Sequence, residues 1–291
     1  MSYDLHFTGR DVSAAEFTSY FKSRKRYRGS SPQVIYENEK TGVYFSFEHT
    51  RAVNQGEDVD PNAPPSSITL VLNLIRPHIF ALEAEPEIRA LVDAFRFTVF
   101  DPQMEGMGTG AYQSEGFFRG WNVANKVGVQ VVLQQNKASL CTYPKEKLER
   151  IWKWNRWCEM LQEELQEDIF VPRISFLKKS GMAVSFIVWG DAIPTVIPEV
   201  DYILAVRKEL APKGLFKSGP DHCLLSFEEA GKALGSYLRH DFELPVYKLP
   251  APKSPEEIRN YVRRLKPYAE KLEGWPMDKI IDQELVDECL A

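Results

Sequence analysis

The chain has 291 residues, 44% of them hydrophobic and 12% aromatic, and its formal net charge is −5. A chain of this length buries a sizeable core, as one large domain or two smaller ones, and its composition differs from that of disordered proteins. The small acidic excess argues against a nucleic-acid-binding protein, which carries a basic excess or a basic face.

The sequence carries few signals of cellular location. The first residues, MSYDLHFTGRD, lack the cationic and apolar segments of a secretory signal, and no run approaches eighteen apolar residues. The four cysteines are scattered without CxxC spacing, so we interpret them as buried thiols in a reducing compartment. We therefore expect a cytoplasmic protein without a membrane partner.

The first elements alternate between strand and helix patterns. Residues 3–7 predict a strand, and Ser13 with Glu16 forms a capping box that begins a helix. Two β-rich runs from Gln33 to His49 flank a four-residue turn, which indicates a hairpin. The proline-rich stretch 52–67 predicts an exposed loop.

That loop carries one metal-like pattern. Asp58, Asp60 and Asn62 resemble the start of a calcium-binding loop, but Ala63 and Thr69 stand where the loop requires Gly and Glu. We therefore predict no metal there.

The middle of the first half is apolar. Residues 68–75 predict a central strand covered on both faces, and Pro86 fits the first turn of a helix that runs to Phe95. A strand at 97–100 leads into the glycine loop Gly106–Gly110, and Ser114 is placed to cap the next helix. The loop lacks both GxGxxG spacing and a following GK[ST], so a structural or partner-contacting role is favoured over anion binding.

The second half predicts another set of strands and helices. A helix from Pro144 to about Gln166 places Ile151, Trp154, Cys158, Leu161 and Leu165 on one stripe. Trp152 and Met160 fall outside that stripe, and each is either buried by a second layer or available to a partner. The remaining expected strands lie at 171–177, 182–189, 201–206, 223–226 and 242–247. The remaining expected helices are 226–239, which a Ser226–Glu229 capping box begins, 255–271, which Ser254 caps, and 278–290.

These elements predict an α+β fold with two lobes, each a mixed or antiparallel sheet with packed helices. We place the first lobe at residues 1–135 and the second, which ends in two helices, at 136–291.

The patterns of known reaction centres are missing from the sequence. The five histidines form neither HxH nor HExxH spacing, and no GxSxG elbow occurs. We therefore assign no catalytic, cofactor-binding or metal-binding residues.

Four segments, SYDLHF, YENEKTGVYFSFEH, LNLIRPHIFALEAEPEI and DPQMEGMGTGAYQSEGFFRGWN, resemble a family of uncharacterised bacterial cytoplasmic proteins. This family is associated with polymorphic-toxin and type VI secretion loci, where its members resemble immunity proteins. The likeness covers mainly residues 2–126. It implies a protein that binds a cognate toxin of the same cell and blocks it by stoichiometric occlusion, and it supplies no active-site residues.

An inhibitor of this kind requires a rigid surface with complementary charge. Its mildly acidic character suits the basic groove of a nuclease toxin. The partner-contacting residues that we predict are Glu57, Asp58 and Asp60 in the acidic loop and the aromatic residues Tyr112, Phe117 and Trp152, for which core packing is the alternative. Two other functions remain open: an enzyme acting on a nucleotide or on a toxin's modification product, and an adaptor that loads an effector.

Overall fold

The chain folds into two compact units. The computed structural model describes residues 1–49, 68–103, 105–135, 140–165, 168–179, 182–212, 221–242 and 244–291. The first unit consists of Met1–Lys145 and Asp278–Ala291, and the second of Glu146–Met277. The α+β fold, with several sheets and packed helices, is therefore confirmed. The boundary differs from the expected one at 135/136, and the last residues lie in the first unit instead of the second.

A seven-stranded sheet with the order β2-β3-β4-β5-β1-β6-β7 forms the first unit, and its neighbouring strands pair antiparallel. The strands are β1 (Ser2–Thr8), β2 (Tyr27–Ser30), β3 (Gln33–Asn38), β4 (Val43–His49), β5 (Ile68–Asn73), β6 (Thr98–Phe100) and β7 (Thr109–Gly110). The β3–β4 hairpin confirms the turn expected at 39–42.

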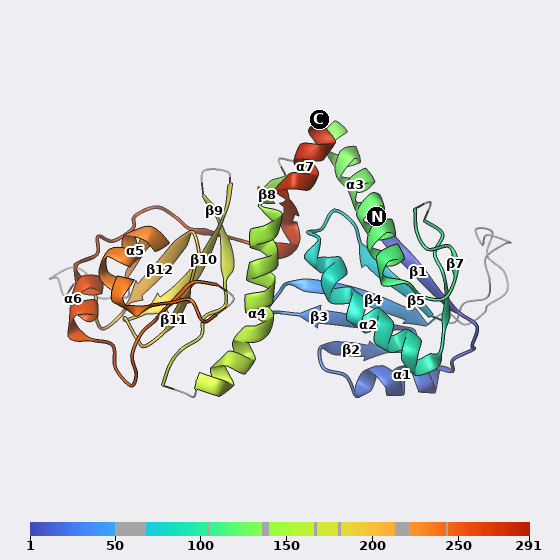
Figure 1. Cartoon of the computed structure of the whole chain (residues 1–291), viewed down its shortest axis with the longest axis horizontal. Helices are drawn as coiled ribbons and strands as arrows, with labels where there is room; N and C mark the ends of the chain where they lie inside the picture. The colour runs from blue at the N-terminus through green and yellow to red at the C-terminus, as the bar shows by residue number, and fades with distance from the viewer. Residues whose placement is uncertain are drawn as a thin grey trace. The chain divides into compact units, whose positions relative to one another are not determined.

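One face of this sheet carries the core. Alternate side chains of β1, β4 and β5 are buried, as the period of two in a strand requires. Helices α1 (Ala14–Lys22), α2 (Ile79–Phe95) and α3 (Ser114–Gln134) supply the opposing buried side chains, and Figure 1 shows α2 lying along the sheet. Residues 69, 71 and 73, which lie on the other face of β5, are only partly buried. The prediction that both faces of this strand are covered was therefore wrong.

The helix starts show which capping predictions hold. The Ser13–Glu16 capping box of α1 is present, with the Glu16 amide donating to Ser13 Oγ over 3.2 Å. Helix α2 begins at Ile79, so Pro86 lies inside it instead of in its first turn. Helix α3 begins at Ser114, whose hydroxyl donates to Glu85 instead of capping the helix.

The C-terminal segment completes the first unit. Strand β17 (Ile280–Asp282) pairs parallel with β8 (Cys141–Tyr143), and helix α7 (Gln283–Leu290) packs beside α3. A small core of Val129, Ile281 and Val286 joins α3 to this segment. The last helix therefore docks on the first lobe.

The second unit contains a five-stranded sheet with the order β13-β12-β10-β9-β16, in which β10 and β12 are parallel and the other pairs antiparallel. A three-stranded sheet, β11-β15-β14, lies in the same unit. The strands are β9 (Ser175–Lys179), β10 (Met182–Gly190), β11 (Val196–Pro198), β12 (Tyr202–Arg207), β13 (Asp221–Ser226), β14 (Leu238–Arg239), β15 (Val246–Lys248) and β16 (Glu273–Trp275). The helices are α4 (Lys145–Leu165), whose first residue belongs to the first unit, α5 (Phe227–Leu234) and α6 (Glu256–Arg264), with 3-10 turns at Gly235–Tyr237 and Met277–Lys279.

Two helices of this unit are shorter than expected. The Ser226–Glu229 capping box begins α5 as predicted, but the helix ends at Leu234 instead of about 239. Helix α6 has no side-chain cap from Ser254 and ends at Arg264 instead of about 271. There the buried Arg207 guanidinium donates to the carbonyl oxygens of residues 262, 263 and 265, each over 3.0 Å, and so binds the end of the helix.

Candidate functional site

Helix α4 is fixed to the second unit by one face. The Trp154 indole donates to the Pro172 carbonyl oxygen over 2.9 Å. The Asn155 side chain donates to the Ile174 carbonyl over 2.9 Å and accepts from the Ile174 amide over 2.8 Å. Ile151 and Cys158 are buried on the same side. This face matches the predicted apolar stripe, and it holds the helix rigidly.

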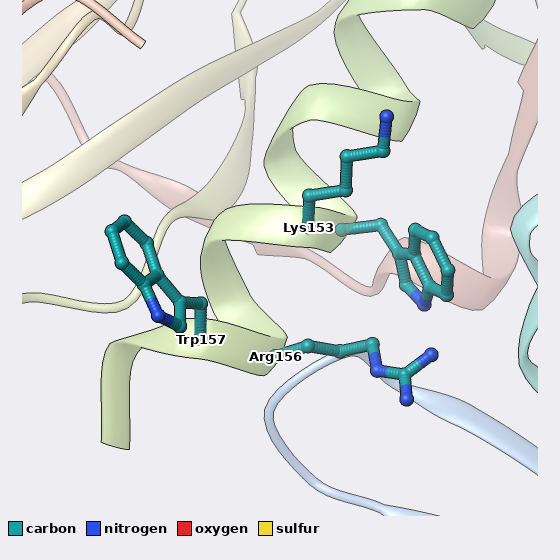
Figure 2. Close-up of a pocket in the computed structure, with 4 residues that line it drawn as sticks. Lys153, Arg156 and Trp157 are labelled. Atoms are coloured by element: carbon teal, nitrogen blue, oxygen red, sulfur yellow. The ribbon is translucent and has the colours of Figure 1, made fainter. Parts of the chain in front are cut away.

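Another face of α4 carries aromatic and cationic side chains. Figure 2 shows Lys153 on one turn of the helix and Arg156 and Trp157 together on the adjacent turn, with the Arg156 and Trp157 side chains pointing to opposite sides. Together with Trp152 they line a hollow of about 290 Å³. One turn further, Met160 is 55% exposed. We call Trp152, Lys153, Arg156, Trp157 and Met160 the α4 surface.

Arg156 differs from the neighbouring cations of this helix. Lys147 lies 3.9 Å from Asp201, Lys153 lies 3.0 Å from Glu149, and Arg150 pairs with Glu146. Arg156 is exposed and has no carboxylate partner among the described residues. Its guanidinium carbon instead lies 4.9 Å from the centre of the Trp152 ring. One side of the guanidinium therefore faces an indole.

The α4 surface places an exposed guanidinium beside two indole side chains. A guanidinium held over an indole keeps its N–H edge available for a carboxylate, which it can bind through two hydrogen bonds. Trp, Arg and Met are enriched at protein interfaces, and Trp and Arg dominate their binding energy. The hollow lies just below the usual range of small-molecule pockets, about 300–1,000 Å³, so it suits one protruding side chain better than a cofactor.

The predicted partner-contacting residues do not come together. Trp152 is 8% exposed and lines the hollow, whereas Phe117 is 0% exposed and belongs to the core of the first unit. Tyr112 is half-buried with its hydroxyl 3.5 Å from Glu85, and burial followed by the Glu85 charge raises its pKa. Phe117 is therefore corrected to a core residue. Glu57, Asp58 and Asp60, like the calcium-like pattern around them, lie outside the described residues.

The sequence interpretation did not single out Arg156. The signal was present in its spacing, because Arg156 follows Trp152 by four residues and thus lies on the same side of a helix. The sequence did not indicate which of the cations on α4 has no carboxylate partner among the described residues.

The glycine loop is organised around Asp101. The Asp101 carboxylate accepts the amides of Gln103 and Met107 over 3.0 and 3.1 Å and the Tyr3 hydroxyl over 2.5 Å. A Cβ on Gly106 would come within 2.1 Å of this carboxylate. The Met107 amide of the loop and the Gln103 amide just before it thus bind the Asp101 carboxylate inside the protein, which supports the structural interpretation of Gly106–Gly110.

A second hollow, of about 250 Å³, lies in the first unit between α3 and the C-terminal segment. His78 and Asp282 line it, with Nδ1 of the imidazole 2.7 Å from one carboxylate oxygen and the His78 amide donating to the other over 3.0 Å. Lys126 and Glu288 at its edge form an ion pair of 2.9 Å. These contacts attach the C-terminal segment to the start of α2, so we interpret them as structural.

Among the described residues no group of three or more His, Cys, Asp and Glu side chains is placed to hold a metal ion. The cysteines are free thiols, three of them buried and Cys289 half-buried. No described helix is both long enough and apolar enough to span a membrane.

Comparison of the chain with protein-family models, with curated proteins and with solved structures gives no match.

Proposed function

We propose that this protein binds a toxin of the same bacterial cell and neutralises it by stoichiometric occlusion, with the α4 surface as its contact. The observation that carries the proposal is Arg156, an exposed cation over the Trp152 indole without a carboxylate partner among the described residues. The resemblance of residues 2–126 to immunity proteins points to the same class of function.

The α4 surface favours an acidic contact on the toxin. Arg156 offers its N–H edge to a carboxylate, while the hollow beside Trp157 accepts an apolar or aromatic side chain. This differs from the basic nuclease groove that the net charge alone suggested. Complementary charge mainly sets specificity and association rate, and the buried aromatic contact sets affinity.

The two alternative functions, an enzyme and an adaptor, require different properties of the protein. An enzyme acting on a nucleotide needs loop amides for phosphate, yet the Met107 amide in the glycine loop and the preceding Gln103 amide donate to Asp101. An adaptor also binds an effector, but without abolishing its activity. The ratio of protein to toxin at full neutralisation therefore separates the three functions.

The test titrates the purified protein against the toxin encoded by the neighbouring gene. Occlusion predicts loss of toxin activity near equal molarity, because each inhibitor molecule blocks one toxin. Full protection at a small fraction of that ratio indicates an enzyme, and binding without loss of activity indicates an adaptor; either result rejects the proposed mechanism.

Two variants of α4 locate the contact. Arg156→Ala is expected to raise the Kd about 30-fold or more, the effect of losing an interface residue worth about 2 kcal/mol. Arg150→Ala is the matched control, because Arg150 lies on the same helix, pairs with Glu146 and does not line the hollow. Both variants should melt as the wild type does. Equal affinities for the two variants would exclude the α4 surface as the contact.

A further inference from the structure

A third hollow, of about 460 Å³, lies in the second unit beside the three-stranded sheet. It is lined by Ile169, by Tyr237, Arg239 and Lys248 on or next to β14 and β15, and by residues 249–251. We call it the β14–β15 hollow. Its volume falls within the usual range of small-molecule pockets, about 300–1,000 Å³, so it has room for a small organic molecule.

The strand register places two cations on one side of this sheet. Strands β14 and β15 pair antiparallel, with Arg239 opposite Val246. Because side chains alternate along a strand, Lys248 lies on the same side as Val246 and Arg239. The same register continued by one residue beyond β14 brings Tyr237 opposite Lys248. Like charges at neighbouring cross-strand positions weaken the pairing of the strands, and an anion between them offsets this repulsion.

The described residues do not neutralise these two cations. The Nη1 atom of Arg239 donates to the Leu238 carbonyl oxygen over 2.7 Å, which fixes the guanidinium at the end of β14. No described acidic residue lines the hollow. The carboxylates of Asp168, Asp241 and Glu257 are close along the chain or in space, yet none forms an ion pair with Arg239 or Lys248. Glu257 instead accepts the hydroxyl of Tyr237 over 3.1 Å.

The remaining wall of the hollow is apolar. Ile169 is half-buried, Leu249 is buried, and Pro250 and Ala251 are exposed. Two of these positions offer no backbone amide, because Pro250 has no N–H and the Leu249 amide donates to the Thr195 carbonyl oxygen over 3.2 Å. Phosphate sites commonly use several backbone amides, whereas a guanidinium and an ammonium are sufficient for the two oxygens of a carboxylate. The wall therefore favours a carboxylate with an apolar body over a phosphate.

We propose that the β14–β15 hollow binds a small apolar carboxylate, with Arg239 and Lys248 holding the carboxylate and Ile169 and Leu249 contacting the apolar part. A ligand with about ten non-hydrogen atoms reaches a Kd on the order of 0.1–1 mM. The hollow shares no residue with the α4 surface, and the proposal does not depend on toxin binding.

Titration calorimetry of the full chain without toxin tests the proposal, with octanoate as the probe. Octanoate combines one carboxylate with an eight-carbon chain and should bind saturably. Acetate lacks the apolar body and octan-1-ol lacks the charge, so each should bind at least tenfold more weakly than octanoate.

Three variants locate the site. Arg239→Gln and Lys248→Gln each remove one cation and should raise the Kd for octanoate at least fivefold, because each loses a hydrogen bond to a charged group. Lys253→Gln is the matched control, since Lys253 is an exposed lysine of the next segment that does not line the hollow. It changes the net charge by the same amount and should leave the Kd unchanged.

Melting curves accompany each variant, and if one of the two hollow variants does not fold, the other decides. A wild type that does not bind octanoate below about 10 mM would reject the proposal. So would equal binding of octan-1-ol, an octanoate affinity that the hollow variants leave unchanged, or an equal loss in Lys253→Gln. None of these results bears on the toxin titration.

Discussion

Asp101 shows how one buried carboxylate can define a loop. It is 3% exposed and accepts three hydrogen bonds, two from loop amides and one from the Tyr3 hydroxyl. Burial and then the Asp101 hydrogen bond raise the pKa of Tyr3, so the phenol remains the donor. Gly106 is required because any Cβ there would collide with the carboxylate. The glycine pattern is thus explained by close packing around Asp101.

Asp101→Asn is expected to lower the free energy of unfolding by about 2–4 kcal/mol, because an amide replaces one of the accepting oxygens and leaves buried N–H or O–H groups unsatisfied. Tyr3→Phe is the control. It removes one donor, keeps both loop amides bonded and should lower the free energy by about 1 kcal/mol. Urea unfolding measures both, and equal losses would contradict the central role of the loop amides.

At the scale of elements, helix starts depend on partners at very different distances along the chain. The starts of α1 and α5 are stabilised by residues three apart, Ser13 with Glu16 and Ser226 with Glu229. The start of α2 depends on Asp282, which accepts the His78 amide from 204 positions away. That contact and the buried residues Ile79 and Phe80 offset the helix hydrogen bond that Pro86 cannot donate.

The two capping boxes predict a pH dependence of stability. Hydrogen bonds from the backbone and hydroxyl of Ser13 and Ser226 lower the pKa of Glu16 and Glu229 below the usual 4.5. Because the pKa of each carboxyl is lower in the folded protein than in the unfolded chain, the two carboxylates stabilise the fold above about pH 4.5. This stabilisation is lost as the pH falls through their pKa in the folded protein. Calorimetry from about pH 6 to about pH 3 should show a smaller decrease in Tm for the double variant Glu16→Gln, Glu229→Gln than for wild type.

Glutamine preserves the capping box geometry without titrating, so the double variant isolates the charge. Glu115→Gln, a first-turn position of α3 outside any capping box, is the control and should keep the wild-type slope. A double variant with an unchanged slope would show that these two carboxylates do not contribute.

At the scale of the whole molecule, the two units differ in continuity. The second unit is one uninterrupted segment, whereas the first unit needs both ends of the chain. Residues 278–291 supply β17, the carboxylate of Asp282 at the start of α2, and two of the three side chains in the core with Val129. The first unit is therefore incomplete without them.

Expression of the separate segments tests this division. Residues 146–277 should fold alone and melt cooperatively, because their core lies within one continuous segment. Residues 1–145 should melt at a lower temperature than the first unit does in the full chain, and adding a peptide of residues 278–291 in excess should raise that Tm by mass action. Circular dichroism measures both. No response to the peptide would contradict a structural role for the C-terminal segment.

The sequence by itself determined the elements that short-range interactions define. The β3–β4 hairpin, the buried stripe of α4 and both capping boxes depend on residues a few positions apart, so their patterns were sufficient. The end of α6 at Arg264 also has a local signal in the sequence, because Pro267 disfavours helix at the residue before it, although the predicted helix ran on to about 271. The α+β class followed from the order of such elements.

Only the tertiary structure decided what depends on distant partners. The start of α2 at Ile79 and the docking of residues 278–291 require contacts between residues far apart in the chain, which no local pattern encodes. The burial of Phe117 and the exposure of Met160 depend on which neighbours cover each helix. Arg156 was distinguished from the other cations of α4 by the positions of carboxylates in space. Periodicity gives the face of a helix on which a residue lies, but folding determines what that face meets.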